Sequence, residues 1–177
     1  MSKIIKMIIG ALLILVIMFC SINVCQDIGR SLKLDITNQR LYTLSGGTRA
    51  ILAKLHQPVT VKLFYAYTAA LKGPDQIRFF NNYYQYVKSL LEEYVSIANG
   101  MIHLQVIDPR PYSESEENAM QHGLKKFPIT EEENFFFGLV VQTQFGVEKV
   151  IPFFSPDRQS FLEYDVSYLI DTAITRQ

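Results

Sequence analysis

The sequence of 177 residues contains no cysteine after residue 25. Its two cysteines, Cys20 and Cys25, lie near the start. Disulfide bonds and thiol redox chemistry are therefore excluded for the remainder of the chain. Tryptophan is absent as well, and 17 acidic residues balance 17 basic ones, so the formal net charge is zero. Without an excess of positive charge, nucleic acid is not an expected partner.

The sequence also lacks the short spacings that define metal and phosphate sites. His56, His103 and His122 are scattered without an H-x-x-x-H or H-E-x-x-H pattern, so we interpret them as surface or strand residues. The acidic stretches 114–117 and 131–133 are interpreted as a solvated helix face and a loop. No catalytic, cofactor-binding or metal-ligating residue is predicted.

One long apolar run is present, from residue 4 to residue 24, and Lys6 is its only charge. As a helix this run would extend about 31 Å, enough to cross the hydrocarbon core of a bilayer. A cleaved signal peptide is the alternative, but no small-x-small cleavage pattern follows. Lys3 and Lys6 precede the run, which favours a cytoplasmic N-terminus. We expect a single-pass protein of the cytoplasmic (inner) membrane whose domain lies in the periplasm or another extracytoplasmic space.

The predicted organisation is a membrane anchor over 1–25, a connecting strand and helix over 26–58, and a folded domain over 59–177. In the connecting part, residues 32–37 alternate apolar and polar side chains, which predicts a short strand that docks on the domain's sheet. Ser45 is a suitable N-cap for a helix that ends before Pro58.

The domain reads as strands and helices in alternation. Residues 59–66 predict a central strand, a polar linker follows, and residues 75–98 predict a long amphipathic helix. Residues 101–107 predict a second strand, parallel to the first, closed by a turn at Asp108. Ser113 and Glu116 form a capping-box pattern for a short helix.

The C-terminal part predicts an antiparallel hairpin and a last helix. The strands are expected over 135–144 and 147–154, and an apolar stripe marks the helix over 162–173. The order β-α-β-α-β-β-α predicts an α/β fold: a thioredoxin-like domain with a mixed sheet and no CxxC motif, with Pro128 ahead of the third strand where such folds often hold a cis peptide. A flavodoxin-like or other three-layer arrangement remains the alternative.

Aromatic side chains are abundant on the long helix. Because consecutive aromatics on one helix cannot all face inward, we expect some of Phe79, Tyr83 and Tyr86 to be exposed. Exposed aromatics are typical of protein interfaces.

Two signatures, LYTLS at 41–45 and FLEYD at 161–165, carry a resemblance to a known family. With the intervening blocks they resemble the auxiliary component of gliding-motility-type ABC transport systems, the GldG-like family, over about residues 30–172. Members usually continue into a second α/β domain and a C-terminal membrane span, so we expect a short or split member. The matching motif residues are Asp35, Leu41, Tyr42, Thr43, Leu44, Ser45, Thr48, Asp108, Pro109, Gly138, Pro152, Ser155, Pro156, Leu162, Glu163, Tyr164 and Asp165.

The resemblance implies a non-enzymatic, membrane-anchored subunit without cofactors that works beside an ABC permease and, indirectly, its cytoplasmic ATPase. A second extracytoplasmic chain is a further possible partner. The alternative function is an extracytoplasmic glycan- or lipid-binding module that uses exposed aromatics. The candidate interaction residues are Tyr42, Ser45, Phe79, Tyr83, Tyr86, Glu163, Tyr164 and Asp165.

Overall fold

The structure is a computed structural model that describes residue 12 and residues 43–175. Its elements, in chain order, are α2 (Gly46–Leu52), β1 (Val59–Tyr65), α3 (Tyr67–Lys72), α4 (Asp75–Ile97), β2 (Ile102–Ile107), α5 (Glu114–Gln121), β3 (Phe127–Pro128), β4 (Asn134–Phe135), β5 (Phe137–Thr143), β6 (Glu148–Ile151), the 3-10 helix η1 (Pro156–Phe161) and α6 (Leu162–Thr175).

The expected membrane anchor over 4–24 lies outside the described residues, apart from Leu12. The strand expected over 32–37 and the candidate residue Tyr42 lie outside them too. Within the described part of the chain, no helix is both long enough and apolar enough to cross a membrane.

Four strands form a mixed sheet in the order β2-β1-β5-β6. β1 runs parallel to β2, with Val61 opposite Leu104, and antiparallel to β5, with Val61 opposite Val141. β6 returns antiparallel to β5. The predicted parallel pair, the predicted hairpin and the central position of the 59–66 strand are therefore confirmed, and the domain is a mixed α/β fold.

β1 suits an interior position because one face is apolar throughout and the other is apolar toward the end of the strand. Val59, Val61 and Leu63 alternate along one face and are almost completely buried, and Phe64 is buried on the other. A strand enclosed on two sides needs such a composition, since a polar side chain there would lose water without gaining a partner.

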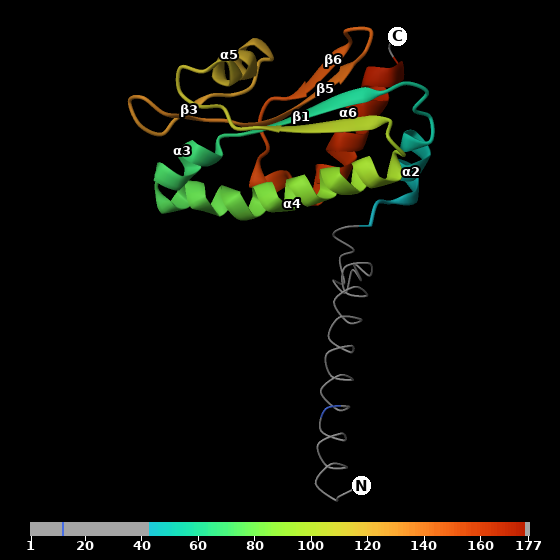
Figure 1. Cartoon of the computed structure of the whole chain (residues 1–177), viewed down its shortest axis with the longest axis horizontal. Helices are drawn as coiled ribbons and strands as arrows, with labels where there is room; N and C mark the ends of the chain where they lie inside the picture. The colour runs from blue at the N-terminus through green and yellow to red at the C-terminus, as the bar shows by residue number, and fades with distance from the viewer. Residues whose placement is uncertain (1–11, 13–42, 176–177) are drawn as a thin grey trace, which may run out of the picture. The chain divides into compact units, whose positions relative to one another are not determined.

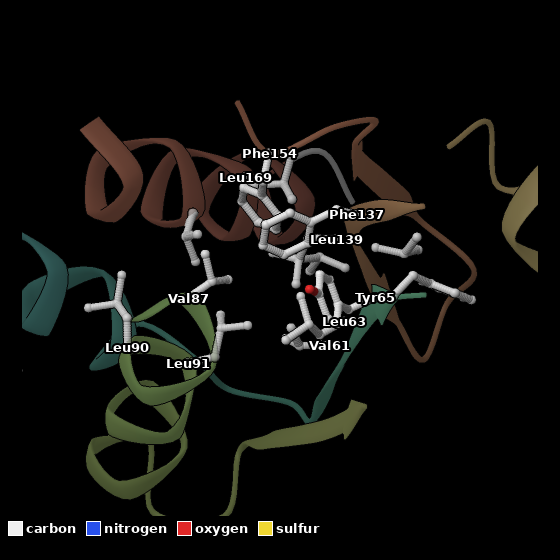
Figure 2. Packing of buried hydrophobic residues seen from close by; sticks show 14 of the residues in the cluster. Val61, Leu63, Tyr65, Val87, Leu90, Leu91, Phe137, Leu139, Phe154 and Leu169 are labelled. Carbon is white, nitrogen blue, oxygen red and sulfur yellow. The ribbon is translucent and has the colours of Figure 1, made fainter. Parts of the chain in front are cut away.

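Helices cover the two faces of the sheet unequally. α4 and α6 lie on one face and α5 on the other (Figure 1). Val87 and Leu91 of α4 and Leu169 of α6 are directed toward the sheet residues Leu63 and Leu139 (Figure 2). This layer between the two long helices and the sheet is the main core.

An aromatic cluster closes the core at the end of β1. The ring of Tyr65 stacks on Tyr84 with centroids 4.1 Å apart, and the rings of Phe135 and Phe137 meet it edge-on at 5.7 and 5.1 Å. Both geometries are favourable for aromatic pairs. Burial, the largest cause, raises the pKa of the Tyr65 hydroxyl to about 12.

Two local expectations differ from the structure. The polar linker expected after β1 contains the helix α3, whose Ala69 and Ala70 are buried in the core. The strand expected from residue 135 is divided: Phe135 pairs with Phe127 in a small second sheet, and pairing with β1 starts at Phe137. None of the described peptide bonds is cis, including the one before Pro128.

Candidate functional site

The two signatures at 41–45 and 161–165 meet in space through the start of α2. Ser45 has extended backbone angles, and its side chain accepts a hydrogen bond from the backbone N–H of Thr48 at 3.3 Å. It is the N-cap that the sequence predicts, and it satisfies one of the free N–H groups of the first helical turn.

Glu163, at the beginning of α6, binds this helix start. Its Oε1 accepts a hydrogen bond from the backbone N–H of Ser45 at 2.7 Å and another from the hydroxyl of Thr48 at 2.6 Å. Such bonds to a charged acceptor are about twice as strong as bonds between neutral groups.

Two further hydroxyl groups extend the contact to α4. Ser167 Oγ lies 2.9 Å from Thr48 Oγ1 and 2.6 Å from the hydroxyl of Tyr94, which also donates to the backbone carbonyl of Glu163 at 3.0 Å. Thr48, Ser167 and Tyr94 are all buried. Ser45, Thr48, Tyr94, Glu163 and Ser167 form what we call the junction cluster, which joins α2, α4 and α6.

Electrostatics of the junction cluster follow from these bonds. Burial on its own would raise the pKa of the Glu163 carboxyl group, but the hydrogen bonds from Thr48 and Ser45 outweigh it, and the pKa is lowered. Burial raises the pKa of the Tyr94 hydroxyl to about 12, against the opposing effect of its bonds to Ser167 and Thr48. At neutral pH Glu163 is therefore charged and Tyr94 neutral, which is the state that the hydrogen bonds require.

Beside the junction cluster, three aromatic side chains are exposed along the outer side of η1 and α6. Phe161, Tyr164 and Tyr168 follow a spacing of three and four residues and are 58%, 66% and 58% exposed. The rings of Tyr164 and Tyr168 are nearly parallel, with centroids 6.1 Å apart. These three residues are called the α6 aromatic surface. A row of exposed rings on one helix face is suited to contact with another molecule.

An ion pair fixes the beginning of this surface. Arg158 donates two hydrogen bonds to the carboxylate of Asp165, at 3.0 and 2.7 Å. The guanidinium carbon of Arg158 also lies 5.8 Å from the ring centroid of Phe161. Asp165, a predicted interaction residue, thus orients Arg158 and Phe161.

The aromatic residues predicted on α4 have three different fates. Phe79 is exposed, as expected for an interface residue, whereas Tyr86 is half-buried against the core. Tyr83 is only 4% exposed, and its ring meets Phe137 at 5.5 Å, so a surface role for Tyr83 is wrong. The helix turns Tyr83 onto the same side as Val87, which faces the sheet.

Sequence reasoning did not single out Tyr94 and Ser167 as parts of a site. Tyr94 lies on the apolar face of α4, and its ring packs in the core. One indication of the site was present in the sequence: Ser167 is a polar residue next to Val166 on the buried face of α6. A buried hydroxyl needs a hydrogen-bond partner, and two are present.

Two carboxylates expected to be solvated are buried instead. Glu116 accepts hydrogen bonds from the backbone N–H of Tyr112 and from Asn134, and Glu133 is paired with Lys72. Both glutamates are 8% exposed. The solvated interpretation is wrong for these two because tertiary partners, Asn134 for Glu116 and Lys72 for Glu133, offset part of the cost of burying each carboxylate.

The histidines are separate in the structure, as their spacing indicates. His56 and His103 are exposed, and His122 Nδ1 lies 2.9 Å from Glu148 Oε1. Across residue 12 and residues 43–175, no group of three or more His, Cys, Asp or Glu side chains is arranged to hold a metal ion.

A small cavity of about 280 Å³ lies on the second face of the sheet, under α5. Its floor is formed by Phe64 and its walls carry Lys62, Asn118 and His122. It combines an apolar floor with polar groups, as small-molecule sites do.

These features define an α/β domain in which the helix that precedes the sheet is joined to the last helix by buried hydrogen bonds. A family model described as a domain of unknown function, DUF7088, matches residues 38–142, from before α2 through most of β5. Since this is more than half of the sequence, the chain belongs to this family. Neither a curated protein nor a solved structure matches the chain.

Proposed function

We propose that the chain is a non-enzymatic, membrane-anchored auxiliary subunit of an ABC transport system. In this proposal residues 4–24 anchor it in the cytoplasmic membrane with the N-terminus inside. Its extracytoplasmic domain contacts a permease, through the α6 aromatic surface, and indirectly the cytoplasmic ATPase of that permease. In this proposal the chain is a member of the GldG-like family.

The observation that carries the proposal is the junction cluster. Ser45 and Thr48 belong to one block of the resemblance, Glu163 belongs to another, and the two blocks are bonded directly. A subunit that passes force or position between a membrane anchor and an outer domain needs a firm connection at this point. The charge-assisted hydrogen bonds to Glu163, together with the buried hydroxyl bonds of Thr48, Ser167 and Tyr94, supply such a connection.

We further propose that the domain is thioredoxin-like. The strand order β2-β1-β5-β6, with β5 antiparallel to its neighbours, supports this, as does the placement of α4 and α6 opposite α5 (Figure 1). A thioredoxin-like oxidoreductase needs a reactive cysteine where α4 begins, and residues 26–177 contain none. The proposed role is therefore that of a binding scaffold.

A second candidate function is an extracytoplasmic glycan- or lipid-binding module, which the cavity under α5 favours. Lys62, Asn118 and His122 offer hydrogen-bond donors above the apolar floor. Saturable binding of a glycan or lipid by the 26–177 fragment, abolished by Asn118→Ala, together with no copurifying permease, would support this function against the first.

The test of the leading proposal is affinity purification of the full chain from membranes in mild detergent. A multispan permease and its ATPase should copurify. A matched control replaces residues 4–24 with an unrelated apolar anchor, and the permease should still copurify because the domain makes the contact. If neither permease nor ATPase is recovered with the natural chain, the proposal fails.

A further inference from the structure

The loop between β2 and α5, residues 108–113, holds Tyr112 in a strained conformation. The φ angle of Tyr112 is +59°, in the left-handed region that glycine and asparagine adopt more readily than an aromatic residue. Its side chain is 88% exposed, and it takes part in no hydrogen bond or ring contact among the described residues. The folded domain therefore gains nothing from the ring, while the backbone disfavours it.

Hydrogen bonds to the carboxylate of Glu116 hold the backbone of Tyr112 in this conformation. The backbone N–H of Tyr112 donates to Glu116 Oε2 at 2.8 Å, and Asn134 Nδ2 donates to Glu116 Oε1 at 2.7 Å. In a standard capping box, Glu116 would accept a hydrogen bond from the backbone N–H of Ser113. Here that N–H donates to the backbone carbonyl of Arg110 at 3.2 Å. The buried carboxylate thus holds the strained residue in place.

The base of the loop is equally constrained. Asp108 accepts hydrogen bonds from the backbone N–H and the hydroxyl of Thr68, at 3.3 and 2.5 Å. Pro109 and Pro111 restrict the backbone on either side of Arg110. The side chain of Arg110 is 70% exposed, with its Nε 3.8 Å from Asp108 Oδ2, so most of its guanidinium faces solvent.

We propose that the 108–113 loop is a preformed recognition element for a partner protein. Tyr112 inserts into an apolar socket of the partner, and Arg110 pairs with a carboxylate at the rim of that socket. Tyr and Arg are the residue types that contribute most to protein interfaces. Because the loop is already rigid, little conformational entropy is lost when it binds.

The shape of the loop favours a protein over a glycan as the partner. A protruding ring needs a concave surface to receive it, which a folded protein provides, whereas small ligands bind in pockets that bury most of their surface. The loop lies at the end of the sheet opposite α2 (Figure 1). It is built from other elements than the α6 aromatic surface, so the inference does not rest on the permease proposal.

A stability measurement separates an internal role of the ring from an external one. Tyr112→Gly in the full chain should leave the unfolding equilibrium constant of the domain unchanged or lower it, because glycine tolerates the positive φ. A rise of tenfold or more would show that the ring stabilises the domain itself and would overturn the inference.

A photocrosslinking experiment tests the external role directly. The photoreactive amino acid p-benzoylphenylalanine is placed at position 112 of the full chain in its own membranes, with position 145 as the control. Phe145 is 70% exposed on a different loop. The inference predicts a discrete protein adduct from position 112, none from position 145, and at least a tenfold loss of the adduct in Arg110→Glu. Equal adducts from both positions, no adduct, an adduct insensitive to Arg110→Glu, or an adduct to glycan or lipid alone would each contradict it.

Discussion

Thr48 donates a hydrogen bond to Glu163 across 2.6 Å, although the two residues are 115 positions apart in the sequence. One belongs to the helix that follows the N-terminal segment, and the other begins the last helix of the domain. This single contact closes the chain on itself and ties the segment nearest the predicted anchor to the end of the fold. Its contribution to stability can be measured.

Replacing Glu163 by Gln should weaken the junction cluster in a pH-dependent way. Hydrogen bonds to a charged group contribute about 1.5–3 kcal/mol, and bonds to a neutral one about half of that. Since the folded-state pKa of Glu163 is lowered, its stabilisation is present above the ordinary value of 4.5 and is lost as the pH falls through the lowered pKa. In urea unfolding of the 26–177 fragment, Glu163→Gln should be less stable than the wild type at pH 7. This difference in stability should shrink below about pH 4.5. The exposed Asp157→Asn is the matched control, and a pH-independent difference would contradict this account.

Leu44→Ala tests whether the LYTLS signature is part of the core. Leu44 is buried and belongs to the same core cluster as Leu52. Its truncation should lower the free energy of unfolding of the 26–177 fragment by roughly 2–4 kcal/mol. A negligible change would mean that this segment is a linker or a surface reserved for the partner.

Alkaline pH should unfold the domain through its buried tyrosines. Burial, the largest cause, raises the pKa values of Tyr65, Tyr83 and Tyr94 from 10.0 to about 12. A raised folded-state pKa means that stability is complete below pH 10 and is lost as the pH rises toward 12. Tyr94→Phe should make this loss shallower, as measured by urea unfolding at increasing pH. If the wild-type fragment and the variant lost stability in parallel, Tyr94 would not be a buried titrating group.

Gly138→Ala should destabilise the sheet, although Gly138 is buried and the substitution changes no exposed side chain. A Cβ at this position would lie 2.7 Å from the backbone oxygen of Ile151 and 2.9 Å from Leu124 Cδ2. The backbone oxygen cannot move without disturbing the β5–β6 pairing, so we expect a loss of roughly 1–3 kcal/mol. Gly46→Ala, at a helix position with no atom within 4 Å, is the control and should be neutral or stabilising. Comparable losses in both variants would contradict the close approach at Gly138.

The parallel pair and the hairpin of the main sheet could be predicted because the spacing of apolar residues and the turn residues determine them locally, whereas α3 and the division of the 135–144 strand could not. The 59–65 segment is rich in β-branched and aromatic residues and is apolar on both faces toward its end, which is typical of a strand in the middle of a sheet. The 145–146 turn likewise follows from Gly146, whose φ is +81°. Each of these signals lies within a few neighbouring residues.

The candidate site was harder to predict because its contacts are long-range. Nothing near Thr48 indicates that its hydroxyl meets Ser167, and nothing near Tyr94 indicates a bond to the carbonyl of Glu163. The burial of Glu116 also depends on Asn134, a residue of another element. A run of acidic residues predicts a solvated segment unless the tertiary partners of those residues are known. Tyr83 was misplaced for another reason: the buried side of α4 is wide, and it includes Tyr83, which lies four residues before Val87.

The most direct test of the account is the recovery of a permease with a chain whose α6 aromatic surface has been removed. The triple variant Phe161→Ser, Tyr164→Ser, Tyr168→Ser changes three exposed side chains and should leave the fold intact, as circular dichroism can verify. In affinity purification from membranes, the account predicts that the wild-type chain and the control Phe145→Ser recover a multispan permease, and that the triple variant recovers at least tenfold less. Equal recovery by a folded triple variant, or no permease with the wild-type chain, would contradict it.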